Sequence, residues 1–143
     1  MKIAIASNHG GFELKELLKA HLSERDIDYE DFGTTAAMVS VDYPNYAQKV
    51  ANAILTEAVD CGILICGTGI GMSIAANRNK GIRAAVVGDV FSAKATKEHN
   101  NANIICLDQR VTGDGLAQMI VDAWLDATFQ GKRHQNRIDM IEN

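Results

Sequence analysis

The sequence predicts a single α/β domain, residues 1–143, in which a five-stranded parallel sheet lies between two layers of helices. Short apolar runs of strand length alternate with longer segments whose apolar residues recur every three or four positions. The most apolar run, Gly62–Cys66, lacks the polar alternation of a half-exposed strand and suits a strand buried on both faces. A chain of 143 residues is long enough for one hydrophobic core and too short for two domains.

The first part of the chain contributes two strands and two helices. We expect the strands at Lys2–Ala6 and Tyr29–Phe32. Between them, leucines at three- and four-residue spacings predict a helix with one buried face. These leucines are Leu14, Leu17, Leu18 and Leu22. Pro44 suits the first turn of a further helix, where its missing N–H group is not needed. The apolar stripe of that helix comprises Ala47, Val50, Ala51, Ile54 and Leu55.

Two more strands follow the central one, at Arg83–Val87 and Asn103–Leu107. Asp89 can cap a helix that runs between them to Glu98. A long amphipathic helix comes next and is expected to end at Gly131, where a short basic segment begins. Its apolar residues are Leu116, Met119, Ile120, Ala123, Trp124 and Ala127. Five strands alternating with helices predict a Rossmann-like, three-layer α/β/α fold with right-handed crossovers.

Charge and composition exclude several classes of protein. A formal net charge of −4 with interspersed signs gives no basic face for nucleic acid. No apolar run approaches the ~18 residues that would cross a membrane, and the N-terminus lacks the pattern of an export signal. Three cysteines without C-x-x-C spacing fit reduced thiols, so we expect a cytoplasmic protein. The four scattered histidines show no ligand spacing, and no metal site is expected.

The candidate functional centre is the glycine-rich loop that follows the central strand. The loop consists of Gly67, Thr68, Gly69, Ile70 and Gly71. Its missing β-carbons let backbone N–H groups approach an anion closely. Helix-forming residues resume at Met72, so the partial positive charge of a helix N-terminus adds to this field. Cys66 lies at the carboxyl end of the strand, where the field favours the thiolate, the form that acts as base or nucleophile.

Other glycine-loop chemistries fit this segment less well. The glycines are spaced G-x-G-x-G, unlike the G-x-G-x-x-G of dinucleotide-binding folds, and no Gly-Lys-Ser/Thr follows as in a P-loop. A cysteine phosphatase loop would need arginine six positions after the cysteine, where this chain has Met72. The alternative of a different class is a small nucleotide-binding or regulatory module without turnover. The absence of a phosphoacceptor aspartate at the end of the third strand argues against it.

The carboxyl ends of parallel strands meet at one edge of a sheet, and ligands bind there. The residues expected at that edge are Asn8, His9, Cys66 with its glycine loop, and Arg110. His99 and Asn100 come at the end of a helix, a position that is compatible with the far side of the sheet within one subunit. We therefore expect a second subunit to bring them to Cys66.

Motifs along nearly the whole chain resemble the RpiB/LacAB family of sugar-phosphate isomerases, in particular its type B ribose-5-phosphate isomerases. Near the start these motifs are S-N-H-G-G-F from Ser7 and V-D-Y-P from Val41. The central one is I-L-I-C-G-T-G-I-G-M-S-I-A-A-N. Further on they are G-I-R-A-A from Gly81, E-H-N-N-A-N from Glu98 and G-K-R-H-Q-N-R from Gly131. Their joint order is far more specific than the glycine loop alone.

The resemblance implies an aldose–ketose isomerase that interconverts ribose 5-phosphate and ribulose 5-phosphate through an enediolate, without metal or nucleotide. It implies that Cys66 is the base and that the amides of Gly67–Gly71 form the anion hole. His99 would open the furanose ring, and Asn100 would contact the sugar. The groups expected to hold phosphate are His9, Arg110, Arg133 and Arg137. The family site is built between the two subunits of a homodimer, and the sequence leaves open whether dimers pair into a tetramer.

Asn8 departs from the family pattern S-D-H-[AG]-G, which has aspartate at this position. A carboxylate accepts hydrogen bonds from sugar hydroxyls and can exchange a proton. An amide cannot exchange a proton usefully near neutral pH. The sequence therefore does not decide which sugar phosphate is the substrate. Galactose 6-phosphate, allose 6-phosphate and a tetrose phosphate are alternatives to ribose 5-phosphate. The sequence also leaves open whether His134, beside Arg133, contacts phosphate or solvent.

Overall fold

The computed structural model describes residues 1–143 and contains the parallel sheet that the sequence predicts. Its strands are β1 (Lys2–Ser7), β2 (Asp28–Asp31), β3 (Cys61–Cys66), β4 (Ala84–Val86) and β5 (Ile104–Asp108). All neighbouring strands are parallel, in the order β2-β1-β3-β5-β4. The predicted α/β class with five parallel strands is confirmed.

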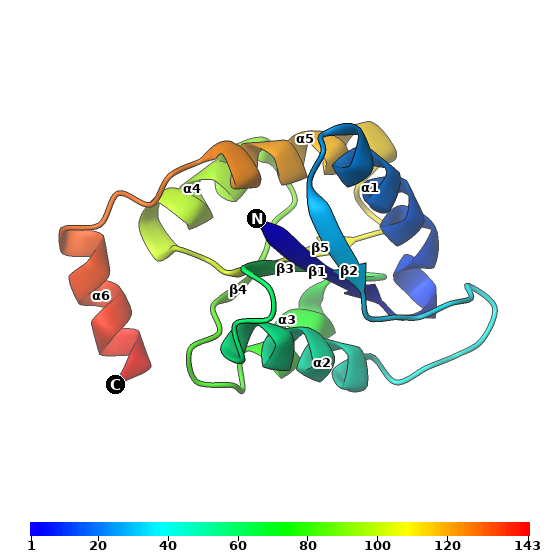
Figure 1. Ribbon diagram of the computed structural model, residues 1–143, viewed down its shortest axis with the longest axis horizontal. Coiled ribbons are helices and arrows are strands. Elements are labelled where there is room, and N and C mark those ends of the chain that lie inside the picture. Colours follow the sequence, from blue (N-terminus) through cyan, green and yellow to red (C-terminus); the bar gives the residue numbers. More distant parts are fainter.

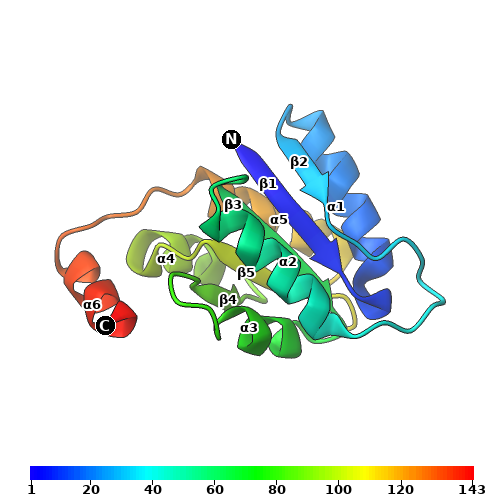
Figure 2. The ribbon, with the colours of Figure 1, turned by 60° about the horizontal axis from the view of Figure 1, so that its bottom comes forward.

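Helices cover both faces of this sheet (Figure 1). The helices on one face are α1 (Phe12–Glu24), α4 (Val90–Asn100) and α5 (Asp114–Asp126), and those on the other are α2 (Tyr43–Leu55) and α3 (Ile70–Ala76). A short 3-10 turn, η1 (His9–Gly11), joins β1 to α1. The last helix, α6 (Arg133–Glu142), stands apart from these layers beyond α4 (Figures 1 and 2). None of the helices has the length and apolar character that crossing a membrane requires.

Each face of the sheet has its own apolar core, because alternate residues of a strand point to opposite faces. Ile3 and Ile63 belong to the core beneath α1, α4 and α5, together with the fully buried Trp124. Leu64 and Cys66 belong to the core beneath α2 and α3. The side chain of Cys66 therefore lies on the α2 and α3 side of the sheet.

The chain changes direction across the sheet between β1 and β3. β2 lies on one side of β1, and β3 lies on the other. In open α/β sheets such a reversal leaves a crevice outside the carboxyl ends of the two strands. The segments that leave β1 and β3 begin with Asn8 and Gly67, so the fold brings these two segments to the crevice.

Three helices differ from the sequence-based expectations. The long amphipathic helix expected to end at Gly131 is α5, and it ends at Asp126. The helix predicted to end at Glu98 continues to Asn100, so His99 lies in its last turn. It ends at Asn101, which adopts the left-handed conformation (φ 46°) that asparagine tolerates. The basic segment after Gly131 is a ten-residue helix, α6.

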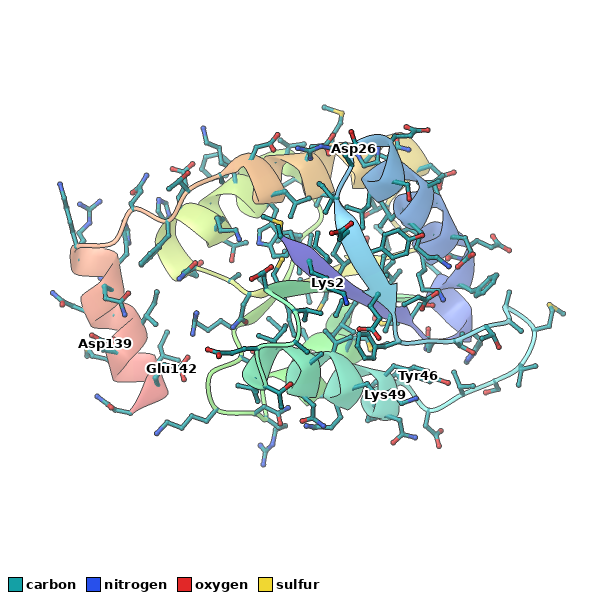
Figure 3. The ribbon with its side chains drawn as sticks, viewed as in Figure 1. Lys2, Asp26, Tyr46, Lys49, Asp139 and Glu142 are labelled. Carbon is teal, nitrogen blue, oxygen red and sulfur yellow. The ribbon has the colours of Figure 1, made fainter.

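Hydrogen bonds at both ends hold α6 to the rest of the chain. Glu142 lies on the side of α6 that faces the other elements (Figure 3) and accepts from Arg83 Nη1 at 2.7 Å and from the Gly81 N–H at 3.0 Å. Before α6 begins, Gln130 donates to Glu98 through its backbone N–H (3.0 Å) and its side-chain amide (2.6 Å). The position of α6 thus depends on its links to α4 and to the segment before β4.

Lys15 of α1 is a buried cation that ties this helix to the end of β2. Its side chain is 1% exposed, and Nζ donates to the Asp31 carboxylate (2.7 Å) and the Thr34 carbonyl (2.6 Å). Burial alone would raise the pKa of Asp31, but hydrogen bonds from Lys15, the Gly33 N–H and Lys19 outweigh it and hold this pKa below its ordinary value. The ion pair therefore favours the folded state.

We expect Lys15→Met to lower the free energy of unfolding by about 2 kcal/mol, because it leaves the buried Thr34 carbonyl without a donor and removes one of the donors to the Asp31 carboxylate. Urea unfolding at pH 7 measures this difference. The contribution of Asp31 is present above the ordinary aspartate pKa and is lost as the pH falls through the depressed value. The gap between wild type and variant should therefore narrow below about pH 4. Lys19→Met is the control, because it removes a more exposed cation from the same carboxylate. It should lower the free energy of unfolding by less than about 0.5 kcal/mol. Equal losses of stability in the two variants would contradict the role of burial.

Candidate active site

Cys66 is the last residue of β3, and its thiol faces the glycine loop. The residue is 5% exposed, and the Gly69 N–H donates to its Sγ atom at 3.0 Å. A hydrogen-bond donor at this distance stabilises negative charge on the sulfur. The thiol also lines a cavity at the carboxyl edge of the sheet. The structure thus places a sulfur atom, main-chain donors and open space side by side.

Not all N–H groups of the glycine loop are free. Gly69 donates to the Cys66 sulfur, and Ile70 donates to Thr68 Oγ1 at 3.4 Å. The loop N–H groups without an acceptor in the chain are those of Gly67, Thr68 and Gly71. Unpaired donors at the entrance to a helix are available to an anion. The loop therefore offers three donors, fewer than the five amides that the sequence suggested.

Two loop glycines are required by the geometry. Gly69 has φ 76°, in the left-handed region, and a β-carbon there would lie 3.1 Å from the Leu107 carbonyl oxygen. A β-carbon on Gly71 would lie 2.7 Å from the ring of Tyr43. Tyr43, the first residue of α2, therefore lies against the loop, and it lines the cavity. Sequence reasoning missed Tyr43 as a site residue, although it belongs to the V-D-Y-P motif.

Asn8 and His9 leave β1 with their side chains oriented by backbone N–H groups. Asn8 Oδ1 accepts from the Gly10 N–H at 3.0 Å and caps η1, so its NH₂ group is free. His9 Nδ1 accepts from the Val41 N–H at 3.3 Å. A backbone N–H can only donate, so the neutral imidazole carries its proton on Nε2. Both side chains line the cavity and offer hydrogen-bond donors to a ligand.

The cavity at this edge has a volume of about 210 Å³ and brings together most of the predicted residues. Its lining residues are Asn8, His9, Gly10, Tyr43, Cys66, Gly67, Thr68, Gly71 and Arg110. Arg110 lies against the loop, and its backbone N–H donates to the Gly67 carbonyl at 3.1 Å. Its side chain packs close to Gly67, because a β-carbon added there would lie 3.2 Å from Arg110 Nε. The guanidinium of Arg110 forms no ion pair in the chain. An arginine with free donors beside unpaired amides suits a phosphorylated ligand.

The other two cysteines are core thiols, as the sequence predicts. Cys61 and Cys106 are both buried and reduced, and neither lines the cavity. Burial raises the pKa of the Cys61 thiol to about 11 and likewise raises the pKa of Cys106. Both thiols therefore stay protonated at neutral pH, which leaves Cys66 as the sulfur that can act in the cavity.

The remaining predicted residues form a second cluster where α4 ends and α6 begins. The ring of His99 stacks on that of His134, with centroids 4.6 Å apart and planes at 18°. His134 is 7% exposed, and its Nε2 atom has no hydrogen-bond partner. Loss of hydration, together with the positive charges of Arg133, His99 and Arg137, lowers the pKa of His134. Arg133 and Arg137 are exposed and form no ion pair, so this cluster, which includes Asn100, is open to an anion.

The two clusters lie at opposite ends of the strands. Cys66 ends β3, whereas α4 ends beside the start of β4, where Arg83 Nε donates to the Asn100 carbonyl at 3.0 Å. A strand of six residues spans about 20 Å, so His99 cannot reach Cys66 of the same chain. We call the cavity residues the Cys66 half-site. The His99 half-site consists of His99, Asn100, Arg133, His134 and Arg137.

The chemistry available at the Cys66 half-site is proton transfer next to a stabilised anion. A thiolate can take a proton from a carbon beside a carbonyl group, while neighbouring N–H donors stabilise the oxyanion that forms. No group of three or more histidine, cysteine, aspartate or glutamate side chains is arranged to hold a metal ion.

Comparison with known proteins identifies relatives of the whole chain. The family described as Ribose/Galactose Isomerase matches residues 3–141. The chain is 49% identical to ribose-5-phosphate isomerase B of Escherichia coli (strain K12) over 140 residues, which cover 98% of this chain and 93% of the relative. Its structure resembles ribose-5-phosphate isomerase B of Clostridium thermocellum with a TM-score of 0.97 and 50% identity, covering 99% of this chain and 95% of that chain. It also resembles ribose-5-phosphate isomerase B of Mycoplasma genitalium with bound ribulose-5-phosphate, with a TM-score of 0.95 and 42% identity over 99% and 93% of the two chains.

Proposed function

Because the chain belongs to the RpiB/LacAB family of sugar-phosphate isomerases, we propose that it interconverts ribose 5-phosphate and ribulose 5-phosphate through an enediolate. Relatives named as type B ribose-5-phosphate isomerases match the chain over nearly its full length at about half identity. The observation that carries the proposal is the position of Cys66 Sγ, which lies 3.0 Å from the Gly69 nitrogen in a cavity with unpaired loop amides.

In the proposed reaction Cys66 is the base that moves a proton between two carbons. The thiolate takes the proton from C2 of the open-chain aldose and returns it to C1, while a hydroxyl proton moves from O2 to O1. The negative charge that develops on oxygen is stabilised by the free N–H groups of Gly67, Thr68 and Gly71. Losing one such donor commonly costs about 3 kcal/mol of transition-state stabilisation.

We infer that each active site also uses the His99 half-site of a second subunit. His9 and Arg110 would hold the phosphate from one subunit, and the partner subunit's Arg133 and the partner subunit's Arg137 would hold it from the other. The partner subunit's His99 would open the furanose ring, and the partner subunit's Asn100 would contact the sugar. The position of the two half-sites of one chain at opposite ends of strands about 20 Å long supports this arrangement.

Exposed apolar side chains support a homodimer. They lie on α3, which begins at the Cys66 half-site, on the edge strand β4 and on α6 of the His99 half-site. These residues are Ile70, Ile74, Val86, Met140 and Ile141, with exposed fractions between 41% and 78%. Exposed apolar surface of this kind marks interaction sites. A twofold axis would bury the same surface on both subunits and create two shared sites.

NMR spectroscopy in D₂O with a panel of sugar phosphates tests the proposed function. Ribose 5-phosphate should be converted to ribulose 5-phosphate with deuterium at C1, and with a higher kcat/KM than allose 6-phosphate, galactose 6-phosphate or erythrose 4-phosphate. Faster turnover of one of these three would identify it as the substrate. Calorimetric binding of a nucleotide without turnover of any sugar phosphate would favour the non-catalytic module.

Asn8→Asp is expected to raise kcat/KM for ribose 5-phosphate by about tenfold, a fraction of what a well-placed acid–base group contributes. Aspartate keeps the cap on the Gly10 N–H and adds a carboxylate oxygen that can accept from sugar hydroxyls and assist ring opening. Asn8→Ala is the control, because it removes the cap without adding a carboxylate. Steady-state kinetics check the result, and an unchanged kcat/KM would show that His99 suffices for ring opening.

A further inference from the structure

Arg83 joins the two helices that carry the His99 half-site. It precedes β4, its side chain is 20% exposed, and all three guanidinium nitrogens are engaged. Nε donates to the Asn100 carbonyl at 3.0 Å and Nη2 to the Asn101 carbonyl at 3.1 Å. Nη1 donates to the Glu142 carboxylate at 2.7 Å. Since Asn100 and Asn101 end α4 and Glu142 ends α6, a single side chain fixes both helices.

The backbone of Arg83 is itself fixed to the amino edge of the sheet. Its N–H donates to Asn103 Oδ1 at 2.8 Å, and its carbonyl accepts from the N–H groups of Asn103 (3.1 Å) and Ile104 (3.3 Å). The side-chain amide of Asn103 donates to the Gly81 carbonyl at 2.9 Å, and the Gly81 N–H donates to Glu142 at 3.0 Å. The guanidinium therefore has a defined position relative to β5 and α6.

Other contacts also hold α6 to the rest of the chain. α6 stands apart from the helical layers (Figures 1 and 2). Besides the Glu142 contacts, α6 is held by the stacked histidine rings, by the hydrogen bonds between Gln130 and Glu98, and by the burial of Ile138, which is 5% exposed. Arg137 is carried by α6 and His99 by α4, so the spacing of these two groups depends on how the helices are joined. The carbonyl groups at the end of α4 also favour a cation, which suits an arginine here.

We propose that Arg83 is a positioning residue for the isomerase reaction. By joining the end of α4 to the end of α6, it holds the His99 half-site in the arrangement that the Cys66 half-site of a partner subunit requires. This inference rests on the shared-site dimer proposed above. Arg83 acts through the residues that it holds, because its own three nitrogens are occupied within the chain. An arginine that served stability alone would change unfolding and leave the kinetic constants of the folded enzyme unchanged.

The kinetic constants of two variants distinguish a positioning role of Arg83 from a role in stability alone. Arg83→Met is expected to raise KM for ribose 5-phosphate about tenfold and to lower kcat about tenfold, because phosphate-binding and ring-opening groups both lose their position. Glu142→Gln leaves the contacts of Arg83 to α4 in place and loosens α6, so it should raise KM with little change in kcat. Arg25→Met is the matched control. Arg25 joins α1 to α5 through Asp122 and Asp126 at 2.7 Å each, away from both half-sites, so its loss should lower Tm and leave KM and kcat unchanged.

Mixed dimers show which half-site Arg83 serves. Arg83→Met subunits refolded together with Cys66→Ala subunits should regain activity, because each mixed dimer then contains one site with both halves intact. Refolded with His99→Asn subunits, they should regain none, because both variants damage the same half. The opposite pattern, or kinetic constants for Arg83→Met equal to those of Arg25→Met, would overturn the proposal.

A control mixture of Cys66→Ala and His99→Asn subunits tests the shared-site dimer separately from the role of Arg83. Regain of activity on mixing Cys66→Ala with His99→Asn, but not on mixing Cys66→Ala with Arg83→Met, would overturn the role of Arg83 alone. No regain in the control pair would overturn the shared site and, with it, the present inference. If Arg83→Met does not fold, Glu142→Gln decides the question, since an unchanged KM would overturn the proposal.

Discussion

Cys66→Ala is expected to lower kcat for ribose 5-phosphate by about 10³-fold, within the range that a positioned acid–base group contributes. The change removes the one sulfur atom that lines the cavity and leaves the loop amides and Arg110 in place. KM should therefore change little. Cys66 also packs in the core beneath α2 and α3, so a modest loss of about 1 kcal/mol in the free energy of unfolding is expected with the fold retained. Steady-state kinetics and deuterium exchange in D₂O measure the loss of proton transfer.

Cys61→Ala is the matched control for this experiment. Cys61 is the first residue of the same strand, is equally buried and has a raised pKa, but it lies away from the cavity. Its replacement should leave kcat and deuterium exchange unchanged. Near-native exchange in Cys66→Ala would mean that another group is the base.

The order of elements could be predicted from the sequence, because strand and helix periodicities differ. The position of β5 between β3 and β4 could not, since the crossover rules allow either order at that edge. The end of α4 was also missed by two residues. Asn101 accepts a left-handed conformation, so the helix continues through His99 and Asn100 before it ends. That extension matters because it places both residues in the last helical turn.

The Cys66 half-site could be predicted in part, because the carboxyl ends of parallel strands bring Asn8, Cys66 and Arg110 together. Tyr43 and Arg83 could not be found this way. Tyr43 reaches the site only because Gly71 lacks a β-carbon, and the three contacts of Arg83 join segments that are distant in sequence. Such contacts depend on tertiary packing, which periodicity and motif spacing do not describe.

Mixing Cys66→Ala with His99→Asn subunits is expected to restore about one quarter of wild-type activity, although each homodimer alone is nearly inactive. His99→Asn should itself lower kcat on the furanose substrate by about 10²-fold, since it removes a general acid–base group. Random pairing makes half of the dimers mixed, and each mixed dimer has one intact site and one doubly altered site. The experiment refolds an equal mixture from urea and measures activity per dimer, with each variant refolded alone as the control.

This regain can occur only if one site draws on two chains. Cys66 lies at the carboxyl end of β3, whereas His99 lies in the last turn of α4, near the start of β4. Because a six-residue strand spans about 20 Å, no rearrangement of side chains within one subunit brings them together. A twofold axis that sets the carboxyl edge of one sheet against the end of α4 in the other subunit does so twice, and it leaves each chain with one contribution to each site. A site complete within one chain would instead be damaged in every subunit whatever its neighbour, and activity after mixing would then equal the mean of the two homodimers.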